Sequence, residues 1–249
     1  MAITQQGPLA VISLDDGKAN AIGPQLLATL GQDLDAFDES PARALVLTGR
    51  SGFFSAGLDL ITLAPFDRDA MDAFMRLFEQ VMKRVFALDR PVVAAVGGHA
   101  IAGGCVLAMQ ADLRVCVDRG VRFGTNETQL GIGLPPSALE PMRLAIPTAS
   151  LVRAAYLGEL FEPADALALG LVDELAPPDH WWEAALARAE SLAAVPREAF
   201  AQTKRALRGP VLASMAADHD AAVEGWLDTW FSDEGRARVA AAVERLSSR

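Results

Sequence analysis

The stretch RPVVAAVGGHAIAGGCVLAM, from Arg90 to Met109, passes from an apolar run through a glycine-rich turn into a helical pattern. An earlier stretch, FFSAGLDL from Phe53 to Leu60, is organised in the same way. Backbone N–H groups at a helix start have no intrahelical partner, so both turns could hold a developing oxyanion. One carboxylate, Glu127, follows in FGTNETQLG and would act as a base. Together the three segments indicate a site that forms an enolate.

Strand and helix patterns alternate along the chain, which predicts an α/β fold. Pro24 suits the first turn of a helix, and PVVAAV is the clearest buried strand. We expect strands at Leu9–Asp16, Ala44–Leu47, Pro91–Val96 and Leu113–Val117, and helices at Pro24–Glu39, Asp67–Leu88 and Gly103–Ala111. The last seventy or so residues have helical patterns throughout. The layout that follows is an α/β core over residues 1–195 and a helical C-terminal region over residues 196–249.

Length and composition are those of a globular protein. The chain has 249 residues, of which 51% are hydrophobic and 22% are charged, and its formal net charge is −10. This acidic balance opposes binding to nucleic acid or to anionic membranes. No apolar run approaches the roughly 20 residues of a membrane-spanning helix, and the N-terminus lacks the pattern of a signal peptide. We therefore expect a cytoplasmic protein.

Several familiar site chemistries fit poorly. The turn from Gly98 to Gly104 lacks the Lys and Ser or Thr of a phosphate-binding loop, and the chain has neither GxSxG nor HExxH. The three histidines lie far apart without metal-ligand spacing, so no metal site is expected. The two cysteines, Cys105 and Cys116, read as buried small hydrophobes.

Five segments together resemble the crotonase, or enoyl-CoA hydratase/isomerase, superfamily. They are KANAI at Lys18–Ile22, FFSAGLDL, the stretch Arg90–Asp112, FGTNETQLGI at Phe123–Ile132, and ADALALGLVDEL at Ala164–Leu175. The resemblance implies a crotonase-like spiral of ββα units with a helical C-terminal trimerisation region. It also implies an acyl-CoA thioester substrate, no cofactor apart from the coenzyme A of that substrate, and a homotrimer or hexamer.

The same resemblance assigns roles to individual residues. It implies that the backbone N–H groups of Leu58 and Gly103 form an oxyanion hole and that Glu127 is the catalytic residue. It places the substrate against two loops and an apolar wall: Ala19, Asn20 and Ala21; Ala56, Gly57, Asp59 and Leu60; and Val106 with Leu130. Asp59 and Asp112 stand at positions where the family usually has Asp, and we interpret both as structural residues.

Val106 departs from the pattern of the hydratases. The resemblance implies that hydratases of this family carry one glutamate at the position of Val106 and a second one at the position of Glu127. Valine cannot bind water or move a proton, whereas one carboxylate suffices to shift a double bond. NETQLGI, FFSAGLDL and the alanine at Ala102 are also more similar to mitochondrial-type Δ3,Δ2-enoyl-CoA isomerases, so the isomerase branch is favoured. The alternatives are a hydratase or another crotonase-type reaction, and a non-catalytic acyl-CoA binder.

Two features leave open questions. Glu140 follows Pro135 and Pro136; it reads as a surface helix residue, and would restore a two-acid mechanism if it reached the pocket. An apolar helical stripe near the C-terminus contains Val223, Trp226, Leu227, Trp230 and Phe231. This stripe could pack on its own core, and the resemblance favours equally a role between subunits or over the pocket.

Overall fold

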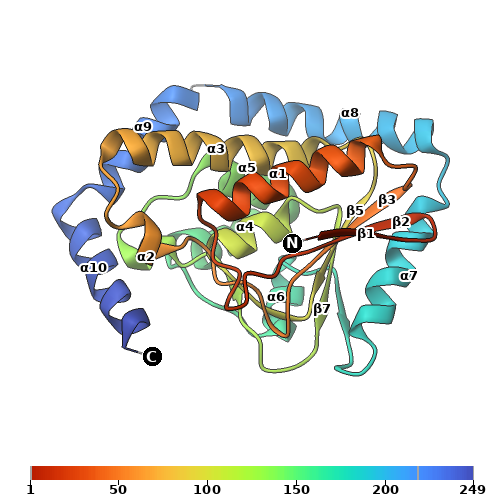
Figure 1. The fold of residues 1–249 in the computed structure, drawn as a ribbon, viewed down its shortest axis with the longest axis horizontal. Coiled ribbons are helices and arrows are strands. Elements are labelled where there is room, and N and C mark those ends of the chain that lie inside the picture. The colour runs from red at the N-terminus through yellow and green to blue at the C-terminus, as the bar shows by residue number, and fades with distance from the viewer. Residues whose placement is uncertain (1, 218, 249) are drawn as a thin grey trace.

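The computed structural model describes residues 2–217 and 219–248 (Figure 1). A sheet of six strands in the order β1-β2-β3-β5-β7-β9 forms its centre. The strands are β1 (Ala2–Gln6), β2 (Leu9–Ser13), β3 (Ala44–Thr48), β5 (Val92–Val96), β7 (Leu113–Val117) and β9 (Glu174–Ala176). β1 pairs antiparallel with β2, and every later pair in this sheet is parallel.

Alternate residues of these strands face two different layers, because successive side chains of a strand point to opposite sides. On one side Ile12, Leu45 and Leu47 share a core with α1 (Pro24–Glu39) and α3 (Arg68–Ala87). On the other side Val11 and Val46 pack with the alanines of α7 (Trp181–Ala193). Helices therefore cover both faces of the sheet, and this confirms the α/β prediction.

A second sheet contains β4 (Gly52–Ser55), β6 (Gly98–Ile101) and β8 (Phe123–Gly124), all parallel. Each follows a strand of the large sheet along the chain, and a helical segment follows each in turn. These segments are α2 (Leu60–Leu63) with α3, α4 (Gly103–Met109), and the 3-10 helix η1 (Glu127–Leu130) with α5 (Pro136–Ala145). The chain thus repeats a ββα unit, as the resemblance predicts.

The segments that lead into the two predicted glycine-rich turns, β4 and β6, are strands of this second sheet. Phe53 and Ser55 pair with His99 and Ala100. A Cβ atom on Gly98 would overlap the backbone of Gly52, so glycine is required for the strands to approach this closely. The other expected elements are confirmed within a few residues of their predicted ends.

The remaining segments complete the molecule after α5. They are the short helices η2 (Thr148–Ser150) and η3 (Val152–Tyr156), then α6 (Pro163–Leu169), β9 and α7, and finally α8 (Arg197–Ala216), α9 (His219–Trp230) and α10 (Asp233–Ser247). Figure 1 shows α10 beside α2 at one end of the molecule, with α7 at the opposite end. Among the residues described, no helix is long and apolar enough to cross a membrane.

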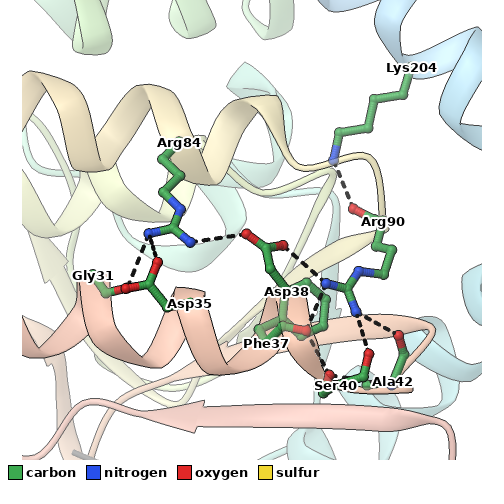
Figure 2. A network of polar contacts seen from close by, with 9 residues as sticks. All are labelled: Gly31, Asp35, Phe37, Asp38, Ser40, Ala42, Arg84, Arg90 and Lys204. Atoms are coloured by element: carbon green, nitrogen blue, oxygen red, sulfur yellow. Dashed lines mark hydrogen bonds and ion pairs between the residues drawn. The ribbon is translucent and has the colours of Figure 1, made fainter.

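Buried cations of α8 attach the C-terminal helices to the sheet. Lys204 Nζ donates to the carbonyl oxygen of Arg90 at 3.1 Å, and the Arg90 side chain donates to Asp38 and to the carbonyl groups of Phe37, in the last turn of α1, and Ala42, just after that helix (Figure 2). Lys204 and Arg208 also both pair with Asp112, at 2.7 and 2.9 Å. Burial lowers the pKa of Lys204 to about 8.

The division of the chain at residue 195 falls between α7 and α8 and stays a prediction, and its outer ends, residues 1 and 249, lie outside the described residues. Asp112 is a structural residue in this arrangement, because its carboxylate joins the start of β5 to α8. It accepts a hydrogen bond from the backbone N–H of Val92 as well as from Lys204.

Candidate active site

Two loops cross where β4 and β6 end, and Gly57 allows them to touch. Its φ of +90° lies in the region that favours glycine. A Cβ atom on Gly57 would stand 2.7 Å from the Cβ of Ala102 and 3.1 Å from the backbone nitrogen of Gly103. Close by, a Cβ on Gly104 would overlap the carbonyl oxygen of Ser55. The chain passes these points only because glycine has no side chain.

Two backbone N–H groups at this crossing are free to bind a ligand. Gly103 is the first residue of α4, so its N–H has no intrahelical acceptor. Leu58 forms a parallel bridge with Ile22, but the bonds of that bridge are made by Gly57 and Asp59 on its two sides. Within residues 2–217 and 219–248, neither N–H donates to another backbone group or to a side chain.

Ala102, which precedes Gly103, has a strained backbone. Its φ of +51° and ψ of −126° define a conformation that residues with a Cβ atom rarely adopt. The turn is held there by the N–H of Ala102, which donates to the carbonyl of Gly124 at 2.8 Å, and by Val106, whose N–H donates to the carbonyl of Ala102 at 3.0 Å. This strained turn directly precedes Gly103, the first residue of α4, which lines the site.

Glu127 is the first residue of η1 and is only 5% exposed. Burial raises its pKa to about 7, although nearby backbone N–H groups of Glu127 and Asn126 oppose the shift. Its Oε2 atom is buried and has no hydrogen-bond partner in the part of the chain described. A buried carboxyl with a pKa near neutrality and a free oxygen is suited to accept and return a proton.

A hollow of about 240 Å³, called the outer cavity below, opens in front of Glu127. Its walls come from the β4–α2 loop, the β6–α4 turn, η1 and α10. They contain Ala56, Leu58, Leu60, Ile101, Ala102, Asn126, Glu127, Leu130, Ile132, Ala242, Arg245 and Leu246. The predicted residues Ala56, Leu58, Leu60, Glu127 and Leu130 are therefore brought together, and α10 adds a wall that sequence analysis had not assigned.

Behind Glu127 is a much smaller space of about 10 Å³, called the inner compartment. Leu58 and Glu127 border both spaces, and Gly103 and Val106 border the inner one. The rest of its wall consists of Met75, Phe78, Pro135 and Trp226. Both predicted N–H donors, the predicted base and Val106 thus surround one apolar space.

The KANAI loop is arranged differently from the expectation. Asn20 is fully buried, and its amide donates to the carbonyl groups of Leu14 and Phe54 at 2.8 and 3.0 Å. It therefore ties the loop to β4 and is not placed to contact a ligand through its side chain. Ala19 accepts a hydrogen bond from the N–H of Ala56 at 2.9 Å, which aligns this loop with the outer-cavity wall.

Ala21 and Asp59 line a separate hollow of about 290 Å³, which also contains Asp15 and Asp16. Asp59 caps α2 by accepting hydrogen bonds from the N–H and hydroxyl of Thr62. Among the described residues that line this hollow none is basic, so its negative border disfavours phosphate groups. Neither Gly57 nor Asn20 is among the residues lining the hollows described above.

Glu140 lies on α5 and pairs with Arg143 at 2.9 Å. It is not among the residues that line the outer cavity or the inner compartment. Cys105 and Cys116 are buried, as predicted. In residues 2–217 and 219–248, no group of three or more His, Cys, Asp or Glu side chains is arranged to hold a metal ion.

Sequence reasoning missed several residues of the two spaces. Arg245 and Leu246 of α10 reach the outer cavity, and Leu246 belongs to the apolar pattern of that helix. Met75 and Phe78 lie on the buried face of α3, and Trp226 lies in the C-terminal apolar stripe. Periodicity marks such residues as buried, but it does not tell which of them face a ligand.

Comparison with known proteins shows the family to which the chain is similar. The family model described as enoyl-CoA hydratase/isomerase matches residues 4–246. Human mitochondrial enoyl-CoA delta isomerase 1 is 29% identical over 241 residues, which are 96% of this chain and 80% of that protein. A putative enoyl-CoA hydratase of Thermus thermophilus is 36% identical over 202 residues, 78% of each chain.

Solved structures agree with the fold. The crystal structure of human mitochondrial Δ3,Δ2-enoyl-CoA isomerase superposes with a TM-score of 0.95 at 28% identity, covering 99% of this chain and 98% of that one. The apo structure of a Mycobacterium tuberculosis enoyl-CoA isomerase gives 0.82 at 33% identity, covering 90% and 96%.

Proposed function

The chain belongs to the enoyl-CoA hydratase/isomerase family, and we propose that it is a Δ3,Δ2-enoyl-CoA isomerase acting through one glutamate. One observation carries the proposal. Glu127 is the only carboxylate among the described residues lining the outer cavity and the inner compartment, and Val106 lines the inner compartment with it.

In the proposed reaction, the thioester oxygen of a 3-enoyl-CoA accepts hydrogen bonds from the N–H groups of Leu58 and Gly103. The Glu127 carboxylate removes a proton from C2, and the electron pair moves into a dienolate whose oxygen these donors stabilise. The protonated Glu127 then returns the proton to C4, so that the double bond moves from C3–C4 to C2–C3. No atom is gained or lost.

The oxyanion donors and the buried base both lower the free energy needed to form the dienolate. An α-proton of a thioester is too weakly acidic for an ordinary carboxylate, and each oxyanion donor is worth about 2.7 to 4 kcal/mol in acyl-transfer enzymes. Burial contributes as well, because it raises the pKa of Glu127 to about 7 and so strengthens it as a base. Val106 and Phe78 maintain the apolar surroundings that cause this shift.

The coenzyme A part of the substrate would lie in the outer cavity, against Ala56 and the α10 wall. Arg245 is the only basic residue among the described residues that line this cavity or the acidic hollow beside Ala21. We therefore place a phosphate group of the coenzyme near Arg245, at the open rim. Ala19 and Ala21 would contribute backbone groups to the uncharged part of the nucleotide.

We further propose a homotrimer or a dimer of trimers. Large apolar side chains are exposed on the single chain at Leu144 of α5, Tyr156 of η3, Leu157 and Leu207 of α8. Burying them between subunits would remove apolar surface from water. Light scattering during size-exclusion chromatography measures the mass directly, and a monomer of 26.4 kDa would contradict this part of the proposal.

A hydratase is the second candidate, because the relative from Thermus thermophilus at 36% identity is described as a putative enoyl-CoA hydratase. Hydration with Glu127 alone is less favourable, since one carboxylate would have to position water and move both protons. A non-catalytic acyl-CoA binder is the remaining alternative. The free N–H groups beside a buried acid disfavour this alternative, because they are the groups that enolate formation requires.

The deciding experiment supplies purified protein with trans-3-hexenoyl-CoA and crotonyl-CoA in parallel. We expect rapid formation of the conjugated thioester from the first and negligible hydration of the second. Glu127→Gln should abolish turnover while acyl-CoA binding remains, and Glu140→Gln, which alters an acid outside both spaces, should leave turnover unchanged. Rapid hydration, or a Glu127→Gln variant with most of its kcat, would overturn the proposal.

A further inference from the structure

We propose that Trp226 forms the end wall of the acyl site and restricts this protein to short acyl groups, of about six carbons. The inference rests on the proposed function in one respect, namely that the ligand is an acyl-CoA. The role of Glu127 as the catalytic base does not depend on where the acyl chain ends.

The direction of the acyl chain follows from which groups border each space. The outer cavity ends at a solvent-exposed rim, where Leu246 is 48% exposed, and unlike the inner compartment it is large enough for part of a coenzyme. Leu58 and Glu127 stand between the two spaces. A thioester held there with its coenzyme outside must direct its acyl carbons into the inner compartment.

The inner compartment has little spare room. Its volume of about 10 Å³ is close to the smallest that accepts one water molecule. Val106, Phe78, Met75 and Trp226 are all buried, so their side chains already fill the surroundings. The reacting C2–C4 unit lies against Glu127, at the border of the two spaces. Beyond it, the inner compartment has space for only about one or two further carbon atoms before the acyl chain meets protein.

Trp226 is the largest of these side chains and is firmly held. It is 4% exposed and stacks on Trp230, with ring centroids 5.4 Å apart at 20°. Thr229, on the same helix, donates to the Trp226 carbonyl at 2.7 Å and accepts from the N–H of Gly133 at 2.9 Å. α9 is thus tied to the loop before Pro135, and a longer chain would have to displace the indole against this packing.

The test measures binding of saturated acyl-CoAs from butanoyl to dodecanoyl by calorimetry, since these ligands bind without reacting. For the wild-type protein we expect affinity to rise about fourfold with each methylene group that is buried. It should reach a maximum at about six carbons and fall at least about tenfold by ten carbons, because overpacking is costly. In Trp226→Ala the maximum should move to chains longer by about two to four carbons, as the removed indole leaves space.

Trp182→Ala is the matched control, since it removes the same kind of side chain from α7 at a residue that borders neither the outer cavity nor the inner compartment; its length maximum should stay in place. Trp226→Phe provides a milder variant if Trp226→Ala fails to fold, and a smaller shift in the same direction is expected. The inference is overturned if wild-type protein binds dodecanoyl-CoA as tightly as hexanoyl-CoA, or if both Trp226 variants keep the wild-type maximum. A length limit without isomerase turnover would contradict the proposed function alone.

Discussion

The backbone nitrogen of Gly103 lies 3.1 Å from the point where a Cβ atom on Gly57 would stand. The two loops that provide the candidate oxyanion donors are therefore in direct backbone contact. This proximity fixes the N–H of Leu58, the next residue along the chain, relative to that of Gly103. Donors held in place before the reaction need no reorganisation as charge develops.

Gly57→Ala should disable the site through this contact. The new methyl group would stand 2.7 Å from the Cβ of Ala102, and alanine tolerates the φ of +90° poorly. We expect kcat/KM for a 3-enoyl-CoA to fall at least about 100-fold, the effect of losing one donor. Gly31→Ala, on α1 with open space around it, should instead stabilise the fold by about 0.5 to 1 kcal/mol. Equal activity of the two variants would contradict the argument.

The activity should depend on the ionisation of Glu127. Because burial raises its pKa to about 7, the carboxylate that accepts the proton is scarce below this pH. We expect kcat/KM to increase tenfold for each pH unit below about 7 and to level off above it. A pH profile measured from 5 to 9 checks this, and a plateau already present at pH 5 would mean an ordinary carboxyl.

The same pKa predicts that Glu127 destabilises the fold at alkaline pH. The unfolded chain ionises near 4.5 and the folded chain only near 7, so the free energy of unfolding falls between these values and then stays low. Glu127→Gln should therefore be more stable than wild type by up to about 3 kcal/mol at pH 8, with a small difference at pH 5. Urea denaturation at both pH values measures this, with Glu140→Gln as the control.

Ala102→Gly should stabilise the protein. Its φ of +51° costs an alanine about 1 kcal/mol or more, and glycine adopts this conformation without that cost. The Gly103 N–H should keep its direction, so activity should persist. Ala108→Gly, a buried helical position in α4, should be destabilising by about 1 kcal/mol or more. Thermal melts that rank the two variants in the opposite order would show that the Ala102 turn is not strained.

Arg245→Gln should weaken acyl-CoA binding. If Arg245 pairs with a phosphate, we expect the Kd to rise about fivefold to tenfold at low salt and the difference to shrink at high salt, because exposed charges are screened. Arg236→Gln removes the same charge at a residue of α10 that does not line the outer cavity. An equal loss in both variants would indicate a general effect of net charge.

Much of the large sheet and of its helices could be predicted, because β3 and β5 are continuous apolar runs and α1 and α3 have a strong helical period. α1 ends at the predicted residues, and β7 does as well. The second sheet escaped prediction because β4, β6 and β8 have four residues or fewer and are rich in glycine. Such segments become strands only when partners distant in the sequence supply their hydrogen bonds.

Local sequence was sufficient for the candidate reacting groups. A helix start after a glycine turn leaves the Gly103 N–H free wherever it occurs, and the family resemblance of the surrounding motif makes Glu127 the candidate base. Only the tertiary structure decided what surrounds them. The pKa of Glu127, the wall made by Trp226 and the arrival of Arg245 at the rim depend on α3, α9 and α10, which lie far away along the chain. Burial and pocket shape arise from packing between such distant segments, and no local pattern encodes which of them meet.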